Sequence, residues 1–386
     1  MGWKRMDVRE QRVEFAVSAV RGEKSLQALC AEHGISRPTG YLWLKRYRES
    51  GVSGIAERSR RPKHCPLQTA WKLEEQVIGL RLRYPDWGAR KLQVMLAREG
   101  VVLTASTVHR ILLRYELVRE QDRPSQATLR FERARPNELW QMDFKGPTHW
   151  QGKVGPLSVL DDRSRYAIAL EPVTSTHGEQ VREHLEHAFT VCGLPEAMLM
   201  DHGTPWWSHN SVGGRTRLAL WLMRQGIALH HGRVRHPQTQ GKVERFHGSL
   251  ARALERRGPT AGEQETWLKD FLWEYNHIRP HEALGMKTPA SVWTCSPRKY
   301  DPHPPPWQYP EGAWTLKIDC QGKIEIHGRS WKVGRAMAGE RVRIEPVEGS
   351  FLIYYCSTLI RELDPAIQRS TMVERWITHR KTTPIV

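Results

Sequence analysis

The chain has 386 residues, which is enough for roughly two to four domains with cores of their own. It carries 59 Lys and Arg residues against 42 Asp and Glu residues, and the formal charge of +17 favours a polyanionic partner, with nucleic acid as the first expectation. No apolar run approaches the roughly 18 residues that span a bilayer, and the charged start is unlike a signal peptide, so a membrane partner is not expected. Six cysteines without a Cys-x-x-Cys pair are typical of free thiols in a reducing, cytoplasmic compartment.

Residues 1–51 have the pattern of a helix-turn-helix domain. Ser25 and Ser36 are placed to cap two consecutive helices, and Gly34 lies in the short turn between them. The second helix of such a unit enters the major groove through its first turns, while basic residues further along meet phosphates. A small helical interaction domain is the alternative. The residues of this helix that we expect to contact DNA are Arg37, Thr39, Tyr41, Lys45 and Arg46.

A basic linker and a second helical unit follow. The linker, residues 52–66, is of the kind that lies along a phosphate backbone or in a minor groove. Residues 67–118 repeat the helical pattern as a second DNA-binding domain, with Asp86 in a predicted turn, and residues 119–136 read as a polar linker. The candidate DNA contacts are Arg58, Arg60, Arg61 and Lys63 in the first linker, and Thr107, His109 and Arg110 in the last helix.

Residues 137–290 alternate strand and helix patterns. Three strands come first, followed by a helix, a strand, a helix, another strand and a final helix. This order describes a central α/β domain with a ribonuclease H-like fold. Thr176 and Glu179 are spaced as a capping box for the first of these helices, and the adjacent Asp161 and Asp162 are predicted as turn residues of a hairpin.

Three carboxylates of this domain are predicted to converge on one end of the sheet. Asp143 lies on the first strand, Asp201 directly follows a short buried strand, and Glu244 lies in the first turn of a helix with an apolar stripe. Because a carboxylate in the first turn also complements the helix dipole, Glu244 alone would not indicate a metal site. Together, three carboxylates suit hard divalent cations such as Mg²⁺, and two such ions stabilise the attacking and leaving oxygens in phosphodiester displacement.

The order of the motifs resembles that of a known family. Trp140–Phe144, Asp201–Trp206 and His236–His247 are similar to the motifs of bacterial insertion-sequence transposases with a retroviral-integrase-type DDE core. The resemblance implies cleavage of 3′ ends at the terminal inverted repeats of an element, followed by strand transfer into target DNA. It also implies two Mg²⁺ ions in each active site, for which Mn²⁺ can substitute, held by Asp143, Asp201 and Glu244.

The resemblance further implies double-stranded DNA as the partner, a homo-oligomer of at least two copies on two DNA ends, and work in the bacterial cytoplasm on the nucleoid. Lys242, Arg245 and His247 are expected at the DNA backbone, and Trp206 as a stacking platform for an unpaired base. The alternative for the three basic residues is a solvated surface, and the alternative for Trp206 is a plain core position. His202 stands where the family usually has Asn.

The C-terminal part has a different pattern. Residues 291–310 are rich in proline, which predicts a stiff linker, and residues 311–364 contain short alternating segments separated by glycine, which predicts a small β-barrel. Similar transposases and integrases end in an SH3-like barrel. Residues 365–386 are a tail with too little pattern to place. The expected fold class is multidomain, with N-terminal all-α helix-turn-helix units, a central α/β ribonuclease H-like domain and this barrel.

Two functional hypotheses explain the charge and the helix-turn-helix units. One is a DNA transposase, and the other is a DNA-binding regulator whose ribonuclease H-like domain is catalytically inert. The three carboxylates, all present in the expected order, favour the enzyme. A ribonuclease is disfavoured, because no other segment has an RNA-binding pattern.

Overall fold

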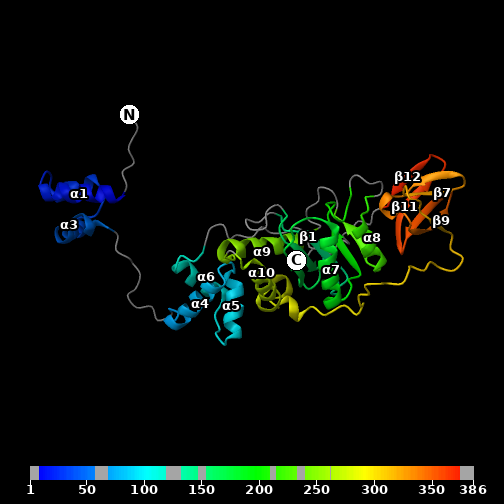
Figure 1. Cartoon of the computed structure of the whole chain (residues 1–386). Helices are drawn as coiled ribbons and strands as arrows, with labels where there is room; N and C mark the ends of the chain where they lie inside the picture. The colour runs from blue at the N-terminus through cyan, green and yellow to red at the C-terminus, as the bar shows by residue number, and fades with distance from the viewer. Residues whose placement is uncertain are drawn as a thin grey trace. The chain divides into compact units, whose positions relative to one another are not determined.

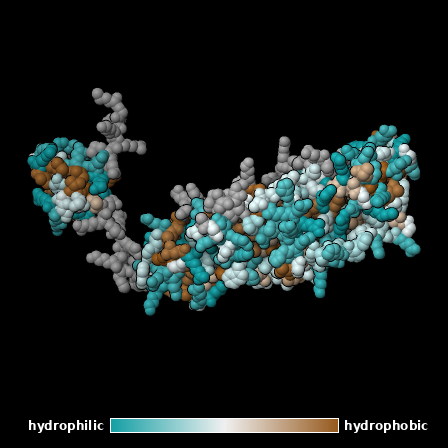
Figure 2. All heavy atoms as spheres, in the orientation of Figure 1, coloured by the Kyte–Doolittle hydropathy of each residue, from teal (hydrophilic) through white to brown (hydrophobic). Residues whose placement is uncertain are grey.

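The computed structural model describes residues 8–56, 68–118, 132–146, 154–208, 214–232, 240–260 and 262–373. The chain divides into two compact units, Met1–Thr69 and Ala70–Val386, each of which is described by itself (Figure 1). Hydrophilic residues dominate the visible surface of the larger unit (Figure 2). Among the described residues, no helix is both long and apolar enough to cross a bilayer. The predicted linker contacts Arg58, Arg60, Arg61 and Lys63 lie outside the described residues.

The smaller unit is a helix-turn-helix domain, as the sequence predicts. Ser25 Oγ accepts a hydrogen bond from Ala28 N at 3.3 Å, and Ser36 Oγ accepts one from Thr39 N at 3.4 Å, so both predicted caps are present. The helices lie close together at Gly40, where a Cβ would stand 2.5 Å from a sulfur atom of the preceding helix. The elements are α1 (Val8–Arg21), α2 (Leu26–Glu32), α3 (Arg37–Ser50) and a 3₁₀-helix (Gly51–Ile55).

The larger unit begins with three helices around a small core. Thr104 Oγ1 accepts a hydrogen bond from Thr107 N at 3.2 Å and caps the third helix. Trp87 is fully buried and stacks on Tyr84, with ring centroids 4.1 Å apart. The helices are α4 (Trp71–Arg83), α5 (Ala89–Arg98) and α6 (Ala105–Arg114).

A mixed five-stranded sheet forms the centre of the larger unit, in the order β3-β2-β1-β4-β5. The first three strands are antiparallel, whereas β4 lies parallel to β1 and β5 lies parallel to β4. The predicted ribonuclease H-like order is therefore confirmed. The strands are β1 (Trp140–Phe144), β2 (Leu157–Asp161), β3 (Ala167–Glu171), β4 (Ala197–Met200) and β5 (Ala228–His231).

Helices cover both faces of this sheet (Figure 1). α7 and α8 share a core with the residues at even positions of β1, and α9 and α10 pack on β2 and β3 from the other face. Because side chains alternate along a strand, Gln141 and Asp143 face α9. The helical elements are α7 (Gly178–Cys192), α8 (Arg217–Arg224), α9 (Gly241–Arg257), α10 (Gln264–Trp273), a π-helix (Glu274–Ile278) and two 3₁₀-helices (Glu282–Leu284 and Pro289–Ser291).

The capping box predicted at Thr176 and Glu179 is wrong. α7 begins at Gly178, and its N-cap residue makes no side-chain hydrogen bond to the helix. Gln180 Oε1 instead accepts hydrogen bonds from backbone N–H groups of the two residues at 174 and 175, each at 3.3 Å. A side chain within the first turn therefore binds the incoming loop.

The C-terminal strands form an open sheet in the order β12-β11-β10-β9-β6, beside the hairpin β7-β8. These pairings among the described residues leave β12 and β6 at the two edges, so they do not show the closed SH3-like barrel predicted for residues 311–364. β12 lies in the segment 365–386, where its short polar sequence gave no strand pattern. The elements are β6 (Thr315–Lys317), β7 (Lys323–Ile326), β8 (Arg329–Lys332), a 3₁₀-helix (Arg335–Met337), β9 (Arg341–Val347), β10 (Ser350–Tyr355), β11 (Thr358–Asp364) and β12 (Arg369–Met372).

A buried ion pair joins the α4–α6 helices to the central domain. Arg279, only 2% exposed, donates a hydrogen bond from Nη1 to Asp86 Oδ2 at 2.8 Å. The guanidinium of Arg257, near the end of α9, lies 3.4 Å from Asp86 Oδ1. Burial opposes ionisation of Asp86, yet these two cations lower the pKa of its carboxyl below the ordinary value. The predicted turn residue is thus also an interdomain anchor.

We expect Asp86→Ala to destabilise the protein by about 3–5 kcal/mol, because it leaves the buried guanidinium of Arg279 without its carboxylate, whereas Arg257 keeps its ion pair with Glu274. Urea denaturation followed by circular dichroism measures this loss. Glu265→Ala, which removes an exposed ion pair with Lys269, is the matched control and should leave the unfolding midpoint unchanged. Equal midpoints for the Asp86 variant and wild type would contradict the anchoring role.

Candidate active site

The pairing of β1 with β4 brings two of the candidate carboxylates to one edge of the sheet. The strands are parallel, and Trp140 and Gln141 pair with Met198 and Leu199. Continuing this register by two positions places Asp143 opposite the residue that directly follows β4. That residue is Asp201, so both aspartates lie at the carboxyl end of β4, where open sheets of this type bind their ligands.

Helix α9 supplies the third carboxylate. Val243, Phe246 and Leu250 are buried along one stripe of α9, as the sequence predicts, and Glu244 is exposed beside them. The backbone N–H of Val243 donates to Gln141 Oε1 at 3.3 Å, which fixes the first turn of α9 against β1. Residues 233–239, which precede this helix, lie outside the described part of the chain.

The negative charges of Asp201 and Glu244 act on the carboxyl of Asp143. Burial, and then the negative charges of Asp201 and Glu244, raise the pKa of Asp143 from 3.8 to about 7. Although Glu244 is exposed, partial removal of its carboxyl from water raises its pKa above the ordinary value. A divalent cation would relieve this repulsion, so the donor set fits Mg²⁺ or Mn²⁺. Within the described residues, however, no three His, Cys, Asp or Glu side chains are already grouped tightly enough to hold an ion.

Two residues that were predicted to contact the DNA backbone are turned inwards instead. The ammonium group of Lys242 forms an ion pair with Asp162, and the Lys242 side chain is only 13% exposed. His247 is buried and its Nε2 lies 3.0 Å from Ser158 Oγ, while burial lowers its pKa to about 4 and so favours the neutral ring. Both predictions are corrected by this placement, because the side chains hold α9 on the sheet. Arg245 is exposed, as a DNA contact requires.

The hairpin aspartates have a larger role than the predicted turn. Asp161 Oδ1 accepts hydrogen bonds from the N–H and hydroxyl of Ser164, which confirms a turn residue. Asp162 is fully buried and accepts a hydrogen bond from Gln141 Nε2 at 2.8 Å in addition to its ion pair with Lys242. The sequence pattern predicts only a turn here, and not this anchor. The available signal was the second aspartate, since a single turn needs only one.

Trp206 is a core residue, so the predicted stacking of an unpaired base is not supported. Its side chain is 1% exposed and stacks on Phe144, with ring centroids 5.1 Å apart. Both faces of the indole are therefore within the protein. His202, in the position where Asn was expected, packs edge-on against Trp207 with centroids 4.7 Å apart.

The predicted DNA contacts of the helical units divide by exposure. Arg37, Tyr41 and Lys45 of α3 are exposed, as are His109 and Arg110 of α6. The remaining three are only partly exposed and make local contacts: Thr39 binds Ser36, Thr107 binds Thr104, and the Arg46 guanidinium lies 4.9 Å from the ring centroid of Trp43.

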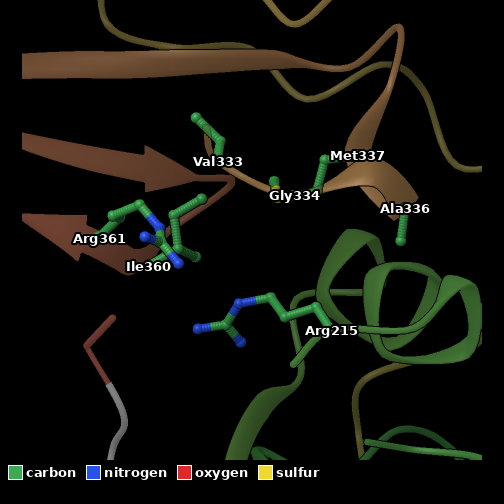
Figure 3. Close-up of a pocket in the computed structure, with 7 residues that line it drawn as sticks. All are labelled: Arg215, Val333, Gly334, Ala336, Met337, Ile360 and Arg361. Carbon is green, nitrogen blue, oxygen red and sulfur yellow. The ribbon is translucent and has the colours of Figure 1, made fainter. Parts of the chain in front are cut away.

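A small cavity between the central domain and the C-terminal sheet is not a rival site. Its volume is about 10 Å³, which is at most the space of one water molecule. Figure 3 shows Arg215 reaching toward the sheet residues Ile360 and Arg361 across this space. A nucleotide or a peptide would not fit there.

Comparisons with protein families agree with the arrangement of the chain. Two family models of an integrase core domain match residues 133–237 and 225–289. A family model of the IS481 family transposase C-terminal domain matches residues 313–371. A helix-turn-helix domain matches residues 11–63, and a homeodomain-like domain matches residues 39–112.

Individual relatives are similar over long stretches. An uncharacterized 31.7 kDa protein of insertion element IS407 from Burkholderia multivorans is 25% identical over 231 residues, covering 56% of this chain and 80% of that protein. The transposase for transposon Tn552 from Staphylococcus aureus is 23% identical over 348 residues, covering 74% of this chain and 67% of the relative. The solved catalytic core domain of HTLV-2 integrase, in complex with magnesium, is 17% identical with a TM-score of 0.33, covering 41% of this chain and 97% of that chain.

We expect Asp143→Asn to stabilise the metal-free protein near neutral pH. A carboxyl whose pKa is raised on folding contributes stability that is fully present below the unfolded value of 3.8 and is lost as the pH rises to about 7. The Asn side chain keeps an acceptor for Phe144 N but cannot ionise. Thermal melting in EDTA should therefore show equal midpoints at low pH and a higher midpoint for Asp143→Asn at neutral pH. A lower midpoint at neutral pH would contradict the repulsion between the carboxylates.

Proposed function

Because the chain belongs to the bacterial insertion-sequence transposases with an integrase-type core, we propose that it binds the terminal inverted repeats of its element, cleaves the 3′ ends and joins them to target DNA. The observation that carries this proposal is the register that sets Asp143 beside Asp201, with Glu244 near enough to raise the pKa of Asp143. Acidic groups that repel one another at an exposed sheet edge suit a metal-dependent phosphodiester reaction.

Asp143, Asp201 and Glu244 would hold two Mg²⁺ ions, with Mn²⁺ as a substitute. Bound ions supply Lewis acidity, which activates the attacking oxygen and stabilises the leaving 3′ oxygen. The chain itself orients the three carboxylates and fixes α9 by the pairing of Lys242 with Asp162. In cleavage, a water oxygen bonds to phosphorus as the bond to the 3′ oxygen breaks. In transfer, the freed 3′ hydroxyl oxygen would bond to a target phosphorus as the bond from that phosphorus to the target's 3′ oxygen breaks.

The exposed faces of the helical units would read the element ends. Arg37, Tyr41 and Lys45 of α3 and His109 and Arg110 of α6 are the contacts that this proposal retains, together with Arg245 near the active site. The division of the chain into helix-turn-helix domains at 1–51 and 67–118, a core at 137–290 and a C-terminal domain at 311–364 is part of the proposal. The active assembly would be a homo-oligomer, at least a dimer that pairs two ends, on the bacterial nucleoid.

We expect Asp201→Asn to reduce nicking of an end-containing duplex by more than about 100-fold, because a ligand of the metal pair is neutralised. The assay is a time course of a labelled duplex that carries the element end, with Mg²⁺ or Mn²⁺. Asp270→Asn changes an exposed acid of α10 and should nick as wild type does. If wild type binds the ends but never cleaves with either ion, the protein is a DNA-binding regulator and not an enzyme.

We expect Lys45→Ala, further along α3, to weaken binding to the element end and to lower the slope of log affinity against log salt concentration by about 1, as the loss of one phosphate contact would. Fluorescence anisotropy at several salt concentrations measures both. Arg21→Ala, at the exposed end of α1, removes the same charge elsewhere in the domain. Equal losses from the two substitutions would show that only overall charge matters.

A further inference from the structure

Asp201 lies beyond the end of β4, so strand pairing alone does not orient its side chain. Two donors bind one of its carboxylate oxygens: Oδ1 accepts hydrogen bonds from the backbone N–H of Gly203 at 2.8 Å and from Trp206 Nε1 at 2.5 Å. No described residue donates a hydrogen bond to Oδ2. The carboxylate is thus held by one oxygen, and Asp201 as a whole is exposed.

The indole of Trp206 is itself held by β1, the strand that carries Asp143. Trp206 stacks on Phe144 at an interplanar angle of 17°. Phe144 is the last residue of β1, and its backbone N–H donates to Asp143 Oδ1 at 2.8 Å. A single aromatic contact therefore connects the segments that carry Asp143 and Asp201.

Burial in this core does not by itself give a tryptophan such a partner. Trp221 belongs to the same hydrophobic cluster and is 7% exposed, yet its buried Nε1 has no hydrogen-bond partner among the described residues. The hydrogen bond of Trp206 to Asp201 is therefore not an automatic result of burial in this cluster.

We propose that Trp206 is a positioning residue, which fixes the carboxylate of Asp201 so that Oδ2 is presented to a divalent cation. The proposal rests on the proposed metal-dependent function. Partners that orient a metal ligand are typically worth about 10–100-fold in metal affinity. The role assigned to Trp206 is therefore measurable as cation binding, without any turnover.

Trp206→Phe keeps an aromatic ring to stack on Phe144 and removes the N–H donor. Trp221→Phe is the matched control, because it makes the same change in size at an indole whose N–H has no partner among the described residues. Mn²⁺ binding to the full chain, followed by electron paramagnetic resonance, should weaken about 10-fold in Trp206→Phe and remain at the wild-type value in Trp221→Phe. The thermal melting midpoint in EDTA should fall by similar amounts in the two variants. An equal Mn²⁺ affinity in the two variants would overturn the proposal.

Gly203→Ala tests the same carboxylate without opening a space in the core, and it decides the matter if Trp206→Phe does not fold. An alanine Cβ would stand 2.9 Å from Asp201 Oδ1 and 3.0 Å from Oδ2, so the carboxylate must turn. Weaker Mn²⁺ binding with an unchanged melting midpoint in EDTA is expected, and wild-type binding would contradict the need for a fixed carboxylate.

If wild type neither binds Mn²⁺ nor nicks DNA, the proposed function fails; if it does both and the variants match it, only the role of Trp206 fails.

Discussion

The parallel pairing of β1 with β4 is the constraint on which the rest of the site depends. Side chains alternate along a strand, so a slip of one residue would turn Asp143 from the α9 face to the α7 face. The even positions of β1 prevent this slip, because Trp140 and Met142 are fully buried against the core that includes α7. Apolar packing on one face of the strand thereby sets where a carboxylate appears on the other.

The second constraint is the polar attachment of α9. Its first two turns are tied to the sheet by the Lys242–Asp162 ion pair, by Val243 and Gln141, and by the contact of His247 with Ser158. Buried polar contacts of this kind need defined partners, whereas apolar contacts tolerate sliding. They suit a helix that must present Glu244 at one rotation and one height.

Much of the architecture follows from sequence patterns, but side-chain direction around the site does not. Strand alternation, the serine caps and the apolar stripe of α9 are local, and each predicts an element that the structure contains. The direction of Lys242 and Trp206 depends on partners roughly 80 and 60 positions away, so no local pattern carries it. Proximity to an acidic motif suggested DNA contact, and the structure gives both residues internal partners. Alternating segments separated by glycine predict the C-terminal strands. Whether the edge strands pair and close a barrel depends on tertiary contacts, which no local pattern carries.

The anchoring of α9 at its far end has a mechanical consequence. The helix has 17 residues and is thus about 25 Å long. Glu244 stands in its first turn, and Arg257 in its last turn pairs with Asp86, next to the Pro85 carbonyl that accepts a hydrogen bond from Arg256. A rod pivoting by a few degrees at one end moves its other end by about 2 Å. Because α9 is held at both ends, by Lys242 and Asp162 at its start and by Arg257 and Asp86 at its finish, the turn before α5 denies the helix this swing.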